Sequence, residues 1–139
     1  MKKFSQEHQE TLETGTKNLL QAIGDDPNRD GLLETPKRVA KAYAEIFSAT
    51  GETQFDNYKL FPTDHDSDMV IVADIPFYAM CEHHLLPFFG TVTVGYVPDG
   101  EIIGLSKIPR LVDWAARRPS VQENLTALIC AEMQRIVHP

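Results

Sequence analysis

The first fifty residues carry apolar side chains at the spacing of two amphipathic helices. A first helix is predicted over residues 5–23, because its leucines and isoleucine recur at helical intervals and Gly24 follows as a typical stop. A second helix is predicted to begin at Thr35–Pro36, since a hydroxyl at the N-cap and a proline at the first helical position favour a helix start. We therefore predict an N-terminal helical region over residues 1–50.

The middle of the chain changes to the alternating pattern of strands. Two runs rich in β-branched residues, 69–75 and 88–97, are bounded by turn residues, so we predict two strands. In the second run, valine and tyrosine alternate with threonine from Thr91 to Tyr96, which predicts one buried face. Two strands are too few for a stable open sheet, so we expect their edges to pair with another copy of the chain.

Two helices are predicted after the strands. Ser106 is expected to cap the first of them, and Arg118–Pro119 is expected to end it. Ser120 is expected to cap the second, and residues 120–123 fit a capping box as one interpretation of Glu123. The element order, two helices, two strands and two helices, indicates an α+β fold class with an antiparallel β-hairpin.

Composition and charge narrow the classes of function. The chain has 139 residues, of which 42% are hydrophobic and 24% charged, as in a soluble globular domain. Its net charge of -7 argues against broad nucleic-acid binding, although a local cationic pocket can still bind a small anion. No apolar run approaches the ~20 residues of a membrane span, and no signal-peptide segment follows Met1. We therefore expect a cytoplasmic protein with neither nucleic acid nor membrane as a partner.

The tetrapeptide CEHH at residues 81–84 lies between the two predicted strands and carries the strongest chemical signal. The spacing of Cys81 and His84 suits a zinc ion, which in catalytic sites takes three protein ligands and a water. His83 is then free to act as an acid or a base beside the metal. Two other interpretations stay open: a buried cysteine beside polar loop histidines, and a nucleophilic Cys81 that a histidine activates.

A second candidate site is cationic. Four basic residues, Lys107, Arg110, Arg117 and Arg118, fall within twelve positions. Ser106 and the first two of them lie at the predicted start of a helix, where free N–H groups and the helix dipole favour phosphate. A solvated charged face is the alternative interpretation. However, basic side chains at the N-terminal end of a helix interact unfavourably with its dipole, and their presence there therefore favours the anion-binding interpretation.

The last helix offers a third candidate and a cysteine. Gln122 and Glu123 are open to two interpretations, a capping box or contacts in which the carboxylate accepts two N–H groups from a guanine edge. Cys130 lies among apolar neighbours of the same helix and is predicted to be a packed thiol.

Four collinear segments of the chain closely resemble the GTP cyclohydrolase I family. They read GLLETPKRVA at 31–40, MCEHH at 80–84, IGLSK at 103–107 and RPSVQENL at 118–125. The resemblance extends over nearly the whole chain from residue 5 onward. It implies a tunnelling fold (T-fold), an arrangement in which several subunits join their antiparallel sheets into a barrel with helices outside. Residues 51–139 would form the catalytic region of this fold. It also implies a homo-oligomer, typically a decamer, with active sites between subunits.

The same resemblance implies a hydrolase acting on cyclic amidine C–N bonds. GTP would be converted, with zinc, to 7,8-dihydroneopterin triphosphate and formate, the first step of tetrahydrofolate and pterin biosynthesis. In this reaction a metal-activated water attacks C8 of the guanine ring. The implied roles are zinc ligation by Cys81 and His84, proton donation by His83, assistance to the sugar rearrangement by Ser106, triphosphate binding by Lys107 and Arg110, and guanine binding by Gln122 and Glu123.

The resemblance also implies that family members continue beyond the last helix. That further segment carries a second strand pair and the third zinc ligand, a cysteine, whereas this sequence ends at Pro139. We therefore expect two of the three ligands here. Besides an enzyme of this family, the alternatives are a catalytically impaired module that assembles with full-length subunits, and a cysteine-nucleophile enzyme of the same fold.

Overall fold

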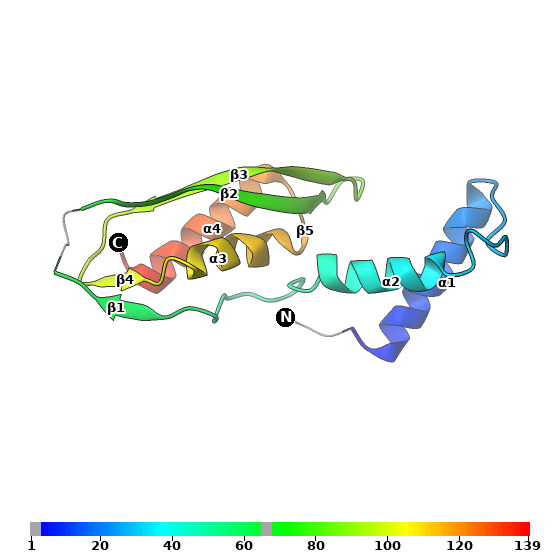
Figure 1. Cartoon of the computed structure of the whole chain (residues 1–139), viewed down its shortest axis with the longest axis horizontal. Coiled ribbons are helices and arrows are strands. Elements are labelled where there is room, and N and C mark those ends of the chain that lie inside the picture. Colours follow the sequence, from blue (N-terminus) through cyan, green and yellow to red (C-terminus); the bar gives the residue numbers. More distant parts are fainter. Residues whose placement is uncertain (1–3, 65–67) are drawn as a thin grey trace. The chain divides into compact units, whose positions relative to one another are not determined.

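The computed structural model of the chain describes residues 4–64 and 68–139 (Figure 1). It divides into two compact units, the first ending at Ser48 and the second beginning at Ala49. We refer to them as unit 1 and unit 2. All residues singled out above for chemistry lie in unit 2.

Unit 1 is a pair of helices, as the hydrophobic pattern predicts. Helix α1 (Gln6–Ala22) begins with a capping box, in which the Ser5 hydroxyl accepts the His8 N–H and the His8 ring accepts the Ser5 N–H. Helix α2 spans Thr35–Ile46, and its N-cap is Glu34 instead of the predicted Thr35. The helix starts early because the preceding turn already bonds the Thr35 N–H to the Leu32 carbonyl.

The main sheet of unit 2 is the antiparallel pair β2 (Val70–Cys81) and β3 (Pro87–Tyr96). Strand β3 confirms the predicted alternation, with its threonines exposed and Val94 and Tyr96 buried. Strand β2 continues well past the predicted run of residues 69–75. The run misleads because a β-bulge between Val72 and Ile75 changes which residues face the core.

The bulge is centred on Asp74, whose φ of 54° lies in the left-handed region. Before the bulge the even-numbered Val70 and Val72 are the half-buried residues, whereas after it the odd-numbered Ile75 and Phe77 are buried. One inserted residue therefore allows both halves of a single strand to present apolar side chains to the same core.

The described residues of unit 2 form three further short strands, so the prediction of two strands was incomplete. Strand β1 (Leu60–Pro62) pairs with β4 (Glu101–Ile103). Strand β5 (Pro119–Ser120) adds to the end of β2 in parallel, with Ser120 opposite Cys81. Such strands of two or three residues are too short to show a period in the sequence.

Helices α3 (Lys107–Ala116) and α4 (Gln122–Val137) lie on the same side of the β2–β3 pair (Figure 1). The core between these helices and the sheet is formed by buried apolar side chains, among them Ile75, Phe77, Val94, Ile108, Leu111, Val112, Ile129, Met133 and Ile136. Burial of each large side chain contributes about 1.5–3 kcal/mol to folding. The α+β fold class is confirmed.

Neither predicted serine makes a side-chain capping hydrogen bond, although Ser106 does occupy its predicted position. Ser106 is the N-cap of α3, but its side chain makes no capping hydrogen bond. The N-cap of α4 is Val121, and the predicted capping box with Glu123 is not formed. Ser120 is held in β5 by its pairing with β2 and its hydroxyl donates to the Val121 carbonyl, so the helix begins one residue later than predicted.

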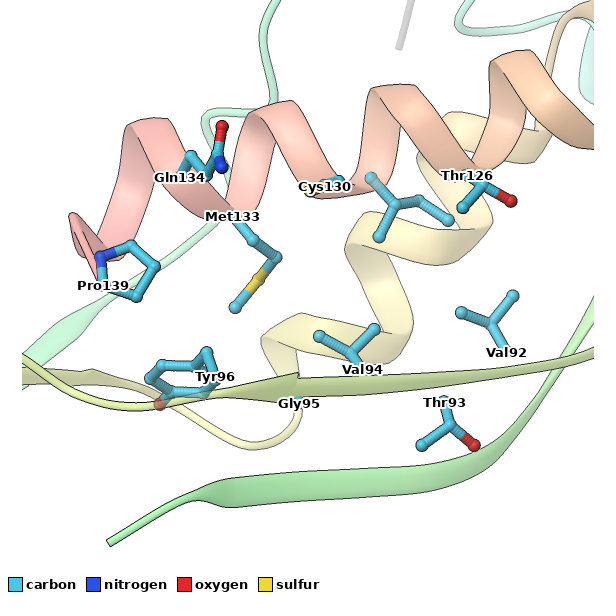
Figure 2. A pocket seen from close by; sticks show the side chains of 11 residues that line it. Val92, Thr93, Val94, Gly95, Tyr96, Thr126, Cys130, Met133, Gln134 and Pro139 are labelled. Atoms are coloured by element: carbon cyan, nitrogen blue, oxygen red, sulfur yellow. The ribbon is translucent and has the colours of Figure 1, made fainter. Parts of the chain in front are cut away.

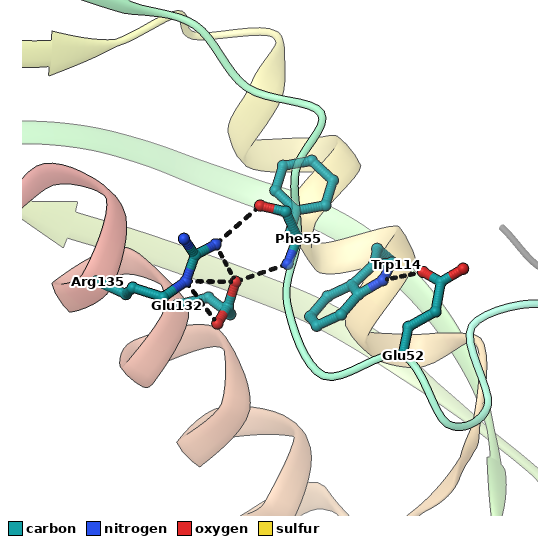
Figure 3. A network of polar contacts seen from close by, with 5 residues as sticks. All are labelled: Glu52, Phe55, Trp114, Glu132 and Arg135. Carbon is teal, nitrogen blue, oxygen red and sulfur yellow. Dashed lines mark hydrogen bonds and ion pairs between the residues drawn. The ribbon is translucent and has the colours of Figure 1, made fainter.

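A polar network ties the irregular segment 52–59 to both helices (Figure 3). The Phe55 N–H donates to the Glu132 carboxylate at 2.7 Å, and Arg135 donates to the Phe55 carbonyl at 2.9 Å. Arg135 also forms an ion pair with Glu132 at 2.7 Å. Burial acts to raise the pKa of Glu132, but hydrogen bonds from Arg135 and the Phe55 N–H outweigh it and hold this pKa below its ordinary value.

Candidate active site

The CEHH sequence forms a tight turn at the end of β2, which we call the 81–86 turn. Cys81, the last residue of β2, is half-buried, whereas the side chains of residues 82–84 are exposed. The turn is closed by two hydrogen bonds, from the Cys81 N–H to the Leu86 carbonyl and from the Leu85 N–H to the Cys81 carbonyl, each 2.8 Å. Leu85 adopts a left-handed φ of 56°, which lets the chain reverse within so few residues.

Within this turn the donor atoms are arranged unequally. The Cys81 sulfur lies 3.8 Å from Nδ1 of His83, while Nδ1 of His84 accepts the Leu86 N–H at 3.2 Å. A thiolate and an imidazole are donor types that zinc prefers. No cluster of three histidine, cysteine or acidic side chains occurs in the described ranges 4–64 and 68–139. The donor types therefore fit zinc, but their number does not complete a three-ligand site.

Strand β5 brings the start of α4 next to the 81–86 turn. Ser120 lies opposite Cys81, and the Glu82 N–H donates to the Ser120 carbonyl at 3.0 Å. Two residues later Gln122 and Glu123 open α4, with both side chains exposed. Because the capping box is absent, the Glu123 carboxylate is not engaged at the helix start and can accept hydrogen bonds from a ligand.

The start of α3 carries the second set of candidate residues. Ser106 and Arg110 are exposed, and Lys107 is half-buried. The Lys107 ammonium donates to the side-chain carbonyl of Asn57 at 2.9 Å, which holds it at the first turn of the helix. Nothing in the sequence pattern singled out Asn57, since it lies fifty residues before its partner in an irregular segment.

The four basic residues of the predicted cationic site do not form one patch. Arg117 forms an ion pair with Asp113 at 2.8 Å, four residues earlier on α3. The Arg118 guanidinium lies over the Trp114 ring, 4.4 Å from its centroid. Only Lys107 and Arg110 remain at the helix start, where an anion is favoured.

The two sets of candidate residues lie at opposite ends of helix α3. Helix α3 begins directly after β4 and ends directly before β5, and its ten residues span about 15 Å (Figure 1). The structure therefore brings Cys81, His83, His84, Gln122 and Glu123 to one end, which we call the turn end. It places Ser106, Lys107 and Arg110 at the other end, which we call the helix end.

A groove of about 330 Å³ lies away from both ends, between β3 and α4 (Figure 2). It is lined mainly by apolar side chains such as Val92, Val94 and Met133. Cys130 lines this groove and is exposed, so the prediction of a packed thiol was wrong. Among the described residues no helix is both long and apolar enough to cross a bilayer.

Comparison with known proteins places these features in a family. The family model described as GTP cyclohydrolase I matches residues 12–139. GTP cyclohydrolase 1 of Lactiplantibacillus plantarum is 56% identical over 137 residues, covering 98% of this chain and 72% of that protein. GTP cyclohydrolase 1 of Enterococcus faecalis is 54% identical over 132 residues, covering 94% of this chain and 71% of that protein.

A further relative carries the name of a bifunctional protein. The bifunctional protein FolKE of Lactococcus lactis subsp. lactis is 54% identical over 131 residues, which are 92% of this chain and 38% of that protein. The family model thus extends over nearly all of the sequence, and these relatives are more than half identical to it. The resemblance read from four short motifs is confirmed, and the chain belongs to the GTP cyclohydrolase I family.

Proposed function

We propose that this chain carries the activity of its family, the hydrolysis of GTP to 7,8-dihydroneopterin triphosphate and formate. The observation that carries the proposal is the pairing of β5 with β2, because it sets a cysteine–histidine turn beside an exposed carboxylate. One group of side chains can then act on a purine ring that the other group holds. The alternative of a non-catalytic assembly module is not favoured, since relatives named as the enzyme match more than 90% of this chain.

At the turn end, the Glu123 carboxylate would accept the N1–H and the amino group of guanine, with Gln122 as a second polar contact. His83 is exposed beside the Cys81 thiol and would donate a proton to the imidazole-ring nitrogen of the substrate. Cys81 and His84 would hold zinc together with a third ligand. When bound, the metal supplies a water of lowered pKa.

At the helix end, Lys107 and Arg110 would bind the triphosphate. They lie within the first turn of α3, where the helix dipole adds to their charge. Ser106 precedes them as the N-cap, and since its hydroxyl makes no capping bond we assign it to the later rearrangement of the sugar.

We further propose a homo-oligomer, the decamer of the family, in which each site is shared between copies. Two observations support it. The triphosphate-binding and guanine-binding residues lie at opposite ends of α3, and a contact between copies would bring the two groups together. The outer face of the sheet also exposes large apolar side chains, with Ile71, Tyr78 and Phe89 at 59%, 76% and 74% exposure, which is typical of a face covered by another subunit.

GTP turnover by the purified chain, followed by fluorescence of the oxidised pterin, tests the activity. Zinc content per chain and native mass are measured on the same sample. We expect product well above that of Cys81→Ala, the control that removes one metal donor. Equal signals from both proteins would remove the catalytic proposal. If Cys81 instead acts as a nucleophile, turnover would persist after zinc is removed by a chelator.

A mixing experiment tests the shared site. The double variant Lys107→Ala/Arg110→Ala and the single variant Glu123→Ala each damage one of the two groups of residues. Each variant alone is expected to be nearly inactive. If sites form between copies, co-refolding equal amounts should restore about a quarter of the sites, because each end then comes intact from one partner half of the time. Sites contained within single chains would show no recovery on mixing.

A further inference from the structure

Arg118 begins the connection between α3 and α4, and its guanidinium is held inside unit 2. It lies 4.4 Å from the centroid of the Trp114 ring, and its Nη1 donates to the Glu52 carbonyl at 2.9 Å. Trp114 in turn donates its ring N–H to the Glu52 carboxylate at 2.7 Å (Figure 3). Arg118 therefore links the end of α3 to the 52–59 segment through one stacking contact and one hydrogen bond.

Arg118 does not contribute as much to the stability of the fold as an apolar side chain of similar size would. Its Nε and Nη2 are buried and have no hydrogen-bond partner within the described part of the chain. Burial lowers the pKa of the guanidinium, an effect that the Glu52 and Glu132 carboxylates only partly offset. Unpaired buried donors destabilise a fold, whereas methionine would pack on the indole without them. A requirement for stability alone does not explain an arginine at this position.

The position of Arg118 in the chain suggests what it does. The next two residues, Pro119 and Ser120, are the whole of β5, and α4 begins at Gln122. A strand of two residues has too few ladder hydrogen bonds to fix its own register, so its flanks must hold it. After β5, helix α4 is anchored by the buried Leu125. Directly before β5, the side chain of Arg118 is anchored as described above.

We propose that Arg118 is a positioning residue for the candidate active site. Its side chain holds the start of β5 against α3 and the 52–59 segment. Ser120 thereby keeps its register with Cys81, and α4 begins beside the 81–86 turn. The catalytic consequence rests on the proposed function, whereas the structural consequence does not.

Hydrogen exchange provides a structural test that is independent of activity. The probe is the Glu82 amide, which donates to the Ser120 carbonyl. We expect Arg118→Met to speed exchange of this amide about tenfold or more, while amides in the middle of β2 and β3 keep their protection and the melting temperature changes little. Arg118→Lys keeps the charge and one donor and should lie between wild type and Arg118→Met. Arg117→Met, which removes the neighbouring arginine, is the matched control.

Kinetics provide the catalytic readout. A shifted turn end should lower kcat by about tenfold to a hundredfold in Arg118→Met. Inhibition by inorganic triphosphate should be unchanged, because Lys107 and Arg110 lie at the other end of α3. Partial recovery of kcat in Arg118→Lys is expected.

Two results would overturn the proposal. Unchanged Glu82 exchange and unchanged kcat in Arg118→Met would show that the arginine positions nothing. Uniformly faster exchange across β2 and β3, with a large fall in melting temperature, would show a purely structural role. An inactive wild type would instead count against the proposed function, and the Glu82 exchange would still decide whether Arg118 fixes β5.

Discussion

The turn end and the helix end hold their candidate residues in different ways. At the turn end the candidate residues are positioned mainly by main-chain hydrogen bonds. Two of these bonds close the 81–86 turn, and a third joins Glu82 to Ser120. At the helix end the contacts are made by side chains. Arg110 and Ser106 are exposed, and Lys107 is held by the amide of Asn57.

These two ways of positioning residues suit the two parts of GTP that we assign to them, the purine ring at the turn end and the triphosphate at the helix end. Chemistry on a purine ring requires atoms placed to a fraction of an ångström, which backbone hydrogen bonds can provide. A triphosphate is a large, multiply charged group that flexible cationic side chains can follow. The 52–59 segment contacts both ends, since Glu52 accepts from Arg118 and Asn57 accepts from Lys107. Changes at the turn end should therefore affect kcat and base selectivity, and changes at the helix end should affect KM.

The largest effect is expected from Glu123→Gln at the turn end. A neutral amide can accept only one of the two guanine N–H groups, so kcat/KM for GTP should fall about a thousandfold. Inosine triphosphate lacks the amino group of guanine, so the preference for GTP over this analogue should nearly vanish. Steady-state kinetics with both nucleotides measure the fall in kcat/KM and the preference for GTP. Glu101→Gln serves as the control. An unchanged preference would show that Glu123 does not bind the base.

The next largest effect is expected from Glu132→Gln in the network that anchors the 52–59 segment. Loss of the buried charge beside Arg135 should destabilise unit 2 by about 2 kcal/mol. Urea unfolding measures the change. Asp113→Asn breaks an exposed ion pair and should cost less than about 1 kcal/mol, so it serves as the control. Equal losses in both variants would contradict the importance of burial.

The same carboxylate predicts how stability depends on pH. Its pKa is lower in the folded chain than the ordinary 4.5, so the unfolded chain binds a proton first as the pH falls. The stabilisation is therefore fully present above pH 4.5 and is lost as the pH falls through the lower folded value. The free-energy difference between wild type and Glu132→Gln should shrink over that interval. A difference that stays constant down to acid pH would refute this assignment.

A smaller effect is expected from Lys107→Ala at the helix end. Loss of one phosphate-binding charge should raise KM for GTP about tenfold and change kcat less than twofold. The increase should become smaller at high salt, which screens the remaining charges. A fall in kcat with KM unchanged would place Lys107 in the chemical step and would break the division between the two ends.

The smallest effect is expected from Asn57→Ala, which leaves the Lys107 ammonium in place without its partner. Because that hydrogen bond is exposed, KM should rise only about twofold. Asn57→Asp should lower the affinity further, since a carboxylate would compete with the triphosphate for the same ammonium. Tighter binding in Asn57→Asp would contradict the pairing.

Parts of this fold could be predicted because their patterns are long. The seventeen residues of α1 and the alternation in β3 each repeat a period several times. Strand β5 could not be predicted, since two residues show no period and one of them is Pro119. The early end assigned to β2 has another cause: the bulge at Asp74 reverses which positions are buried, so no single alternation covers the strand.

For the candidate site, the sequence predicted which residues to consider but not how they are grouped. Lys107 and Arg118 seemed to belong to one cationic cluster because they are close in sequence. The rest of helix α3 separates them, and stacking on Trp114 occupies Arg118. Conversely, Cys81 and Glu123 are forty-two residues apart and are brought to the same end by β5. Such long-range pairing depends on packing that local spacing does not encode.

The bulge at Asp74 also protects β2 against sliding along its partner. Because the two halves of this strand bury residues of opposite parity, a slip by one position would turn apolar side chains toward solvent on both sides of the bulge at once. A slip by two positions would move the left-handed residue away from Asp74 and place it on a bulkier side chain such as Val72. Strand β2, which ends at Cys81, thus has one favoured register against β3. Cys81 therefore occupies the same position in every folded molecule.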